Sequence, residues 1–363
     1  MAETINNTTK PRLQYFDMLK GIAIFMVVMG HVITFCIRGL DRAFAFKLIA
    51  EVHMPLFFFV SGWFSYKALA NGSWKAPDLV SRAKQLLVPM VVMSILWLFY
   101  FPHSGLKTPF HCTFHDMWYQ AGKYGYWFTF VLFEIIAIYA VVRPMFSRLP
   151  RLWMQVVALL AMWALMLTGL NFVPHDIYEL LSLNPMVQYF PVFMFGVLAH
   201  QHSDAFHRLT ESSAAMTVAI PLAGALIYYI GWHWEFAWIE QNVPMPTHIA
   251  RTLLHAALAV IAIGIVRPWS MKAFSPERHK PAVFANMWTV LGRESLAIYL
   301  LHYFFLFPLT PLQTAMNSLN VGFMPMLVNA AFWAAAIIAV VLCVNKIICL
   351  SRPLAWLMTG KIK

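Results

Sequence analysis

The feature that most constrains this chain is the recurrence of long apolar stretches separated by short polar segments. A helix needs about 20 mostly apolar residues to cross ~30 Å of hydrocarbon, and most of these stretches approach that length. The chain is 61% hydrophobic and 11% charged, unlike soluble domains. The sequence therefore predicts an all-α, polytopic membrane helix bundle with about ten transmembrane helices. The predicted spans are residues 21–37, 54–70, 86–102, 124–142, 152–170, 187–198, 214–232, 253–269, 287–309 and 324–350.

One of these stretches, residues 187–198, is short for a span. It is predicted either to extend toward residue 184 or to lie as a re-entrant or interior helix.

The Lys and Arg residues are distributed unevenly between the two ends of the predicted spans. With a cytoplasmic N-terminus and alternating spans, 20 of the 26 basic residues face the cytoplasm, as the positive-inside bias requires. Both termini are therefore predicted to be cytoplasmic, and the net charge of +11 requires no nucleic-acid partner. Residues 1–14 are predicted to form a short cytoplasmic tail, and residues 1–363 a single membrane domain. The four cysteines lack metal-binding spacing, so no metal is expected.

The first apolar stretch carries three ionisable residues, Asp17, Lys20 and His31. Lys20 and His31 are eleven positions apart, so a helix places them within ~20° of one face and ~16 Å apart along its axis. Ionisable groups inside a membrane are costly and often mark a site. A neutral His31 could act as a general base or a nucleophile, or it could simply bond to a neighbouring helix. Asp17 and Lys20 could pair only to finish the helix, or Lys20 could hold an anionic cofactor.

Further polar residues lie in the second and fourth stretches. His53 is predicted near the outer end of its span, in the region that His31 approaches from the first helix. Ser61 permits close packing of helices. Glu134 follows Trp127 by seven positions on the same helix face and is predicted to be the most deeply placed carboxylate, with either a structural or a catalytic hydrogen bond.

Basic residues precede the third stretch, and a histidine lies in the ninth. Arg82 and Lys84 fall in a predicted cytoplasmic loop, where the positive-inside bias alone supplies such charges, although they would also suit the phosphates of coenzyme A. His302 lies about two turns beyond Arg293 and Glu294, and is expected either to line the interior or to lie near the outer interface.

Taken in order, these strings resemble acyltransferase family 3, integral membrane O-acyltransferases of bacterial surface glycans. The clearest similarity is to the family's basic residue, ten positions, then histidine, which falls on Lys20 and His31, with lysine in place of the more frequent arginine. Four further strings match in order and cover nearly the whole length: residues 53–62, 82–89, 126–128 and 291–302. The second-helix string and the compact length are most similar to the branch described as fucose O-acetylase-like.

The resemblance implies an enzyme of the bacterial cytoplasmic (inner) membrane. It would move an acyl group, commonly acetyl, from cytoplasmic acyl-CoA to a hydroxyl of a glycan or lipid-linked sugar. His31 would be central, with Arg82, Lys84 and Lys20 near the donor phosphates. The other candidates are Asp17 and Glu134 for catalysis and His53, Ser61, Trp127 and His302 for binding the acceptor.

A proton-coupled transporter or flippase is the alternative, because His31, Glu134 and His302 would also suit a proton relay. A non-enzymatic membrane scaffold is a third interpretation. The lack of an internal repeat disfavours many transporters, and the ordered motifs favour the enzyme. Since a thioester is already activated, positioning and a base suffice, and no serine or cysteine triad is required.

Overall fold

The computed structural model describes residues 13–37, 44–104, 113–233, 245–275, 282–319 and 322–360. Within these ranges the chain is built of helices, and the one extended pairing is an isolated bridge between Ala68 and Trp74. The prediction of an all-α bundle is confirmed. Helices satisfy their own backbone hydrogen bonds, which the hydrocarbon core of a bilayer requires.

The first half of the chain forms α1 (Gln14–His31), a π-helical turn η1 (Val32–Cys36), α2 (Phe44–Ser65), α3 (Leu79–Tyr100), α4 (Phe114–Tyr119), the 3-10 turn η4 (Lys123–Gly125), α5 (Trp127–Arg148), α6 (Leu152–Gly169) and α7 (His175–Leu180). The second half forms α8 (Leu183–Gln201), α9 (Ser203–Glu211), α10 (Ser213–His233), α11 (Met245–Ala273), α12 (Val283–Arg293), α13 (Ser295–Leu301), the 3-10 turn η6 (His302–Phe305), α14 (Thr310–Ser318), α15 (Phe323–Ile348) and α16 (Arg352–Thr359).

Eight helical segments of the described chain are long and apolar enough to cross a membrane, or nine if one bent pair of helices counts as a span. The prediction of about ten spans differs from this at residues 187–198 and 287–309. The first of these stretches lies in α8, which is buried along almost its whole length and packs against α2, α6 and α11. This burial agrees with the interior-helix alternative.

The prediction of one continuous span over residues 287–309 is wrong. The helix is interrupted at Glu294 between α12 and α13. After η6 the chain bends by 83° between Ser295–Phe305 and Thr310–Met316. Pro308 lies in this bend, where it removes a backbone donor and keeps the preceding residue out of the helical conformation.

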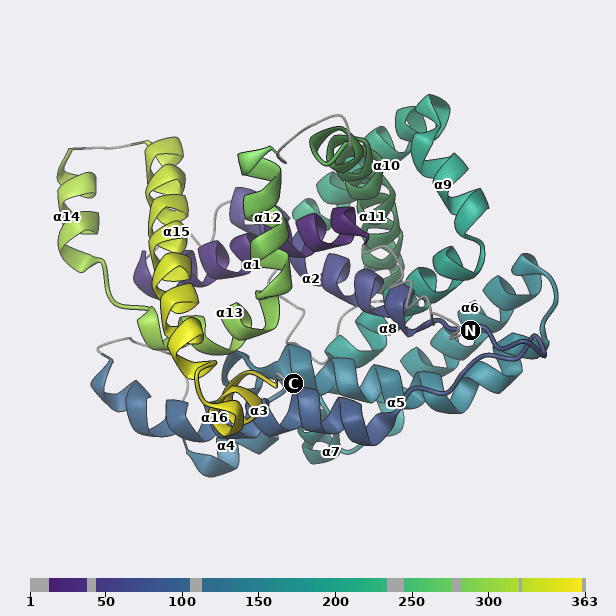
Figure 1. Ribbon diagram of the computed structural model, residues 1–363, viewed down its shortest axis with the longest axis horizontal. Helices are drawn as coiled ribbons and strands as arrows, with labels where there is room; N and C mark the ends of the chain where they lie inside the picture. Colours follow the sequence, from purple (N-terminus) through teal and green to yellow (C-terminus); the bar gives the residue numbers. More distant parts are fainter. Residues whose placement is uncertain are drawn as a thin grey trace, which may run out of the picture.

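Helix α1 lies at the centre of the packing, in contact with α2, α11, α12 and α15. Figure 1 shows α12 crossing α1. The two backbones touch through paired glycines. A Cβ at Gly21 would lie 1.9 Å from the backbone carbonyl oxygen of Trp288, and a Cβ at Gly292 would lie 1.7 Å from the backbone carbonyl oxygen of Asp17. The absence of side chains at these two positions therefore fixes where the 291–302 motif meets α1.

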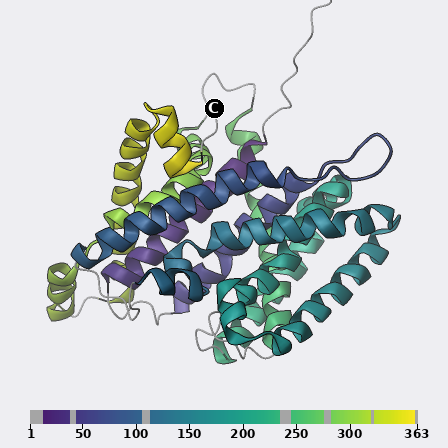
Figure 2. The same cartoon turned by 90° about the horizontal axis from the view of Figure 1, so that it is seen from below.

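A second group of helices lies along one side of α1. In the view from below, α3 and α5 run side by side, and α16 packs against α3 (Figure 2). The beginning of α5 also reaches α13 through hydrogen bonds described below. The helices that surround α1 and the group formed by α3, α5 and α16 therefore meet at the end of α1 that carries His31.

Candidate active site

Two histidines and a tyrosine meet at the end of α1. His31 Nδ1 lies 2.8 Å from His302 Nε2, and His31 Nε2 lies 2.9 Å from the Tyr303 hydroxyl. His302 is fully buried and Tyr303 is 2% exposed. His302 therefore lines the interior, the first of the two positions expected from the sequence.

The hydrogen bonds fix which ring nitrogen carries each proton when both rings are neutral. His302 Nδ1 is 3.0 Å from the Ile298 carbonyl oxygen, which can only accept, so Nδ1 donates and Nε2 is left as an acceptor. His31 Nδ1 must then donate to His302 Nε2. The free lone pair of His31 is consequently on Nε2, where it accepts from the Tyr303 hydroxyl. His31 is thus held as a base with its proton-accepting nitrogen turned away from His302.

The residues just before α5 hold the segment that carries His302 and Tyr303. The Tyr126 hydroxyl donates to the Leu300 carbonyl (3.0 Å), and the Tyr299 hydroxyl donates to the Gly125 carbonyl (2.6 Å). Gly125 has φ +91°, and a Cβ there would lie 2.0 Å from the Tyr303 hydroxyl. Glycine is therefore required both by the backbone and by the close approach. The strings around residues 126–128 and 291–302 are joined directly.

Lys123 anchors the segment that leads into α5. It is 1% exposed, and its Nζ donates to the carbonyls of Trp118 (2.5 Å) and Glu179 (2.8 Å). Burial lowers the pKa of Lys123 to about 8, although the charges of Glu134 and Glu179 oppose this shift. The lysine connects η4 to α4 and α7, and so holds Gly125 and Tyr126 in place.

We expect this lysine to make stability depend on pH. Because its pKa is lowered on folding, the unfolded chain binds more protons between pH 8 and 10.5, so the contribution of Lys123 to stability should rise with pH across that window. The melting temperature of the wild type relative to Lys123→Met should increase from pH 7.5 to 10. Parallel curves for the two proteins would contradict the expectation.

The other predicted acceptor-binding residues, His53, Trp127 and Ser61, lie in different surroundings. His53 Nδ1 bonds to the Ile49 carbonyl (2.5 Å), and His53 is close enough to His31 to interact electrostatically. Trp127 stacks on Tyr189 with ring centroids 5.7 Å apart. Ser61 lies eight residues after His53 on α2, which puts it about 12 Å farther along the helix.

Asp17 and Lys20 form the expected ion pair, with Lys20 Nζ 2.9 Å from Asp17 Oδ1. The sequence did not indicate the second partner: Arg293 Nε lies 3.7 Å from Asp17 Oδ2. Asp17 is 4% exposed and thus links α1 to the end of α12. Lys20 lies about 16 Å, and Asp17 about 21 Å, along α1 from His31, toward the opposite end of the helix.

The prediction that Arg82 and Lys84 lie in a loop is wrong. They belong to the first turns of α3, which Asp78 caps by accepting from the Ser81 backbone N–H (3.1 Å). Arg82 is half-buried beside Gln85, whereas Lys84 is exposed. Residues two apart on a helix point in different directions, so the two side chains leave α3 on different faces.

Glu134 is half-buried, so it is not the most buried carboxylate of the described chain, and its depth within the membrane stays a prediction. One of its oxygens, Oε2, is buried without a hydrogen-bond partner, and the carboxylate interacts electrostatically with Lys123. Asp17 (4% exposed) and Glu51 (9% exposed) are more buried. Exposure depends on which neighbouring helices cover a position, which hydrophobic periodicity does not specify.

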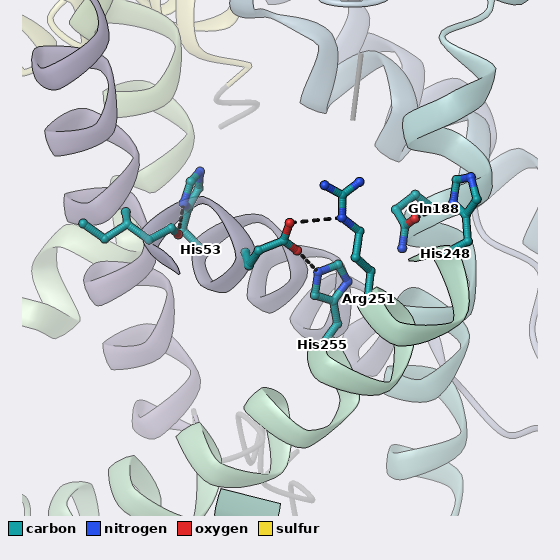
Figure 3. A network of polar contacts seen from close by, with 7 residues as sticks. His53, Gln188, His248, Arg251 and His255 are labelled. Carbon is teal, nitrogen blue, oxygen red and sulfur yellow. Dashed lines mark hydrogen bonds and ion pairs between the residues drawn. The ribbon is translucent and has the colours of Figure 1, made fainter. Parts of the chain in front are cut away.

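Glu51 belongs to a buried polar network that sequence reasoning missed. Its Oε1 lies 3.1 Å from Arg251 Nε, and its Oε2 lies 2.8 Å from His255 Nε2 (Figure 3). Nearby, His248 Nδ1 donates to Gln188 Oε1 (2.7 Å). Arg251 is 2% exposed within α11. One signal was available, because Arg251 and His255 are four apart and share a helix face.

No cluster of three or more His, Cys, Asp or Glu side chains that could hold a metal ion occurs in the part of the chain that the structure describes. The candidate site is built from imidazoles, tyrosines and ion pairs. Such groups can move a proton and donate hydrogen bonds to a developing negative charge.

Comparison with known proteins identifies the family. A family model described as an acyltransferase domain matches residues 13–345. The chain belongs to acyltransferase family 3. This confirms the resemblance inferred from Lys20, His31 and the later strings, and assigns the chain to the membrane acyltransferases.

Two relatives of this chain are named nodulation protein NolL. The protein of Mesorhizobium japonicum is 28% identical over 229 residues, which are 60% of this chain and 56% of that protein. The protein of Sinorhizobium fredii is 35% identical over 100 residues, 26% of each chain. The chain therefore matches little more than half the length of the first relative and about a quarter of the length of the second. No solved structure matches the chain.

Proposed function

We propose that this acyltransferase moves an acetyl group from cytoplasmic acetyl-CoA, or another acyl group from its acyl-CoA, to a hydroxyl of a glycan or lipid-linked sugar in the bacterial inner membrane. The observation that carries the proposal is the direction of the hydrogen bonds from Ile298 through His302 to His31. They leave His31 Nε2 as a proton acceptor inside the bundle, which is what activation of an acceptor hydroxyl needs.

In the proposed reaction the acceptor hydroxyl replaces Tyr303 at His31 Nε2. As the hydroxyl oxygen bonds to the thioester carbonyl carbon, its proton passes to His31. The carbon–sulfur bond then breaks, and the departing coenzyme A sulfur takes that proton. The alternative, in which His31 Nε2 carries the acyl group transiently before the acceptor attacks, uses the same lone pair. His302 holds the His31 ring in both versions.

The donor is proposed to enter at the end of α1 that carries Lys20. Arg82, Lys84 and Lys20 would contact its phosphates, and the pantetheine arm would extend along α1 toward His31. The rise of about 16 Å between Lys20 and His31 is of the order of an extended acyl-pantetheine arm. The Asp17 carboxylate, which Lys20 and Arg293 share, would keep Lys20 in place at this entrance.

The proposal is tested by supplying acetyl-CoA with a labelled acetyl group to the purified protein in lipid nanodiscs. A panel of methyl glycosides serves as acceptors, and labelled sugar and free coenzyme A thiol are both measured. We expect equal amounts of the two products that depend on the sugar. A protein that releases no thiol and labels no sugar, while transporting one of them in sealed vesicles, would favour the transporter alternative.

The donor site offers a separate prediction. Loss of one charge-assisted phosphate contact costs ~1.5–3 kcal/mol, so Arg82→Ala and Lys84→Ala should each weaken acetyl-CoA binding about 10- to 150-fold in calorimetry. Arg151→Ala, which removes an exposed basic residue from the start of α6, is the matched control and should bind normally. Unchanged affinity in the Arg82 and Lys84 double variant would assign both residues to membrane topology alone.

A further inference from the structure

The buried network around Glu51 contains polar atoms that the protein itself does not satisfy. Gln188 is 4% exposed and its Nε2 has no hydrogen-bond partner in the described structure. The same holds for Nδ1 of His255, which is 1% exposed. In Figure 3 the Gln188 amide and the His255 ring lie on either side of the Arg251 side chain. Buried polar atoms without partners are rare in folded proteins and call for an explanation.

The chemistry of the two atoms is complementary. The Glu51 carboxylate can only accept, so His255 Nε2 donates to it and neutral His255 keeps Nδ1 as an acceptor. Gln188 Oε1 accepts from His248 Nδ1, so its Nε2 remains as a donor. One buried donor and one buried acceptor match a group that can do both, and a hydroxyl is such a group.

We propose that Gln188 and His255 bind the ring hydroxyls of the acceptor sugar, so that a neighbouring hydroxyl is presented to His31. The inference rests on the proposed function and names the acceptor as a polyhydroxylated ring. Glu51 and Arg251 are positioning residues, because their ion pair fixes the carboxylate that sets the His255 tautomer.

The network and His31 have a common neighbour on α2. His31 ends α1, and α2, the next α-helix in the sequence, carries Glu51 and His53 in its first half. His53 is near enough to both His31 and Glu51 to interact with each of them electrostatically. The base and the carboxylate that contacts His255 therefore share this histidine as a neighbour.

Aromatic rings adjoin the network. Tyr189 stacks on His255, with centroids 5.8 Å apart and planes at 14°, and on Phe58, with centroids 4.6 Å apart and planes at 9°. Trp127 stacks on the same tyrosine. These stacked rings hold His255 in place and give the network an apolar border, so the hydroxyl-binding atoms lie beside apolar surface, as the sites of ligands with both polar and apolar faces do.

A purely structural role explains the network less well. Replacing a buried ion pair by packed apolar residues is often neutral or stabilising, so stability alone gives little reason to retain one. It gives still less reason to leave Gln188 Nε2 and His255 Nδ1 unsatisfied beside it.

The test measures sugar binding directly, without requiring turnover. Intrinsic fluorescence of the full-length protein in nanodiscs is titrated with methyl α-fucopyranoside, methyl β-galactopyranoside and methyl β-glucopyranoside, and with cyclohexanol as a ring that has a single hydroxyl. We expect at least one glycoside to bind at least tenfold more tightly than cyclohexanol. Gln188→Leu and His255→Phe should each lose that tenfold preference while binding acetyl-CoA as the wild type does.

His200→Leu is the matched control, because His200 is a partly buried, hydrogen-bonded histidine farther along α8 that bonds to the Trp63 carbonyl. If Gln188→Leu does not fold, Gln188→Glu keeps the oxygen that accepts from His248 and removes the Nε2 donor, and the same loss is expected. The inference is overturned if no glycoside outperforms cyclohexanol, or if the Gln188 and His255 variants bind sugar as the wild type does. Sugar binding without any acyl transfer would instead contradict the proposed function alone.

Discussion

Replacing His31 with alanine is expected to lower acyl transfer by about 10²–10⁴-fold, the contribution typical of a positioned general base. If His31 carries the acyl group as a nucleophile, the loss should be complete. The hydrogen bonds to His302 and Tyr303 leave its Nε2 as the only ring nitrogen that can accept a proton, so no other atom of the side chain can substitute. Labelled acetyl transfer to a methyl glycoside by purified protein provides the measurement.

The matched control for this change is His202→Ala. His202 is also a partly buried histidine in contact with another side chain, since its Nε2 lies 3.3 Å from Gln155 Oε1, but it lies at the far end of α8. It should transfer acetyl groups as the wild type does. Both variants should bind acetyl-CoA with unchanged affinity, since neither His31 nor His202 is among the proposed phosphate contacts and Lys20, which is one, lies about 16 Å along α1 from His31. Transfer by His31→Ala at the wild-type rate would exclude His31 as base or nucleophile.

Replacing His302 with phenylalanine should lower kcat about 100-fold while changing KM little. Phenylalanine fills a similar volume but offers no acceptor to His31 Nδ1, so the His31 ring can rotate or place its proton on Nε2, where it blocks the reaction. His302 acts through His31 and does not itself need to touch the substrate. Steady-state kinetics with saturating acetyl-CoA separate the two parameters.

A conservative change distinguishes orientation from packing at this position. His302→Gln restores an oxygen that can accept from His31 Nδ1 and should recover part of the lost kcat. If packing were the cause, glutamine should be worse than phenylalanine, because His302 is fully buried and lies among Tyr299, Tyr303 and the end of α1. Equal activity of the glutamine and phenylalanine variants would contradict the orienting role.

The sequence determined the class of fold and the local pairing of the first site residues. Because each span must satisfy its own backbone in hydrocarbon, apolar stretches of about 20 residues could only be helices. The helical period then placed Lys20 and His31 on one face, and the spacing of three residues paired Asp17 with Lys20, as the structure confirms. These are local consequences of geometry, and they require no knowledge of which helices are neighbours.

Contacts between distant segments could be decided only by the tertiary structure. His31 and His302 are 271 residues apart, and they meet because glycines let α12 lie against α1 and because the chain breaks after Arg293. Glu51 and His255 are 204 residues apart, and the positive-inside bias, which considers only the ends of spans, does not indicate that nearby Arg251 is buried beside them. Hydrophobic pattern records how apolar each helix is, whereas the partner of a buried polar group depends on how whole helices cross. The tautomers of His31 and His302 and the ion pair between Glu51 and Arg251 are therefore properties of the packed bundle.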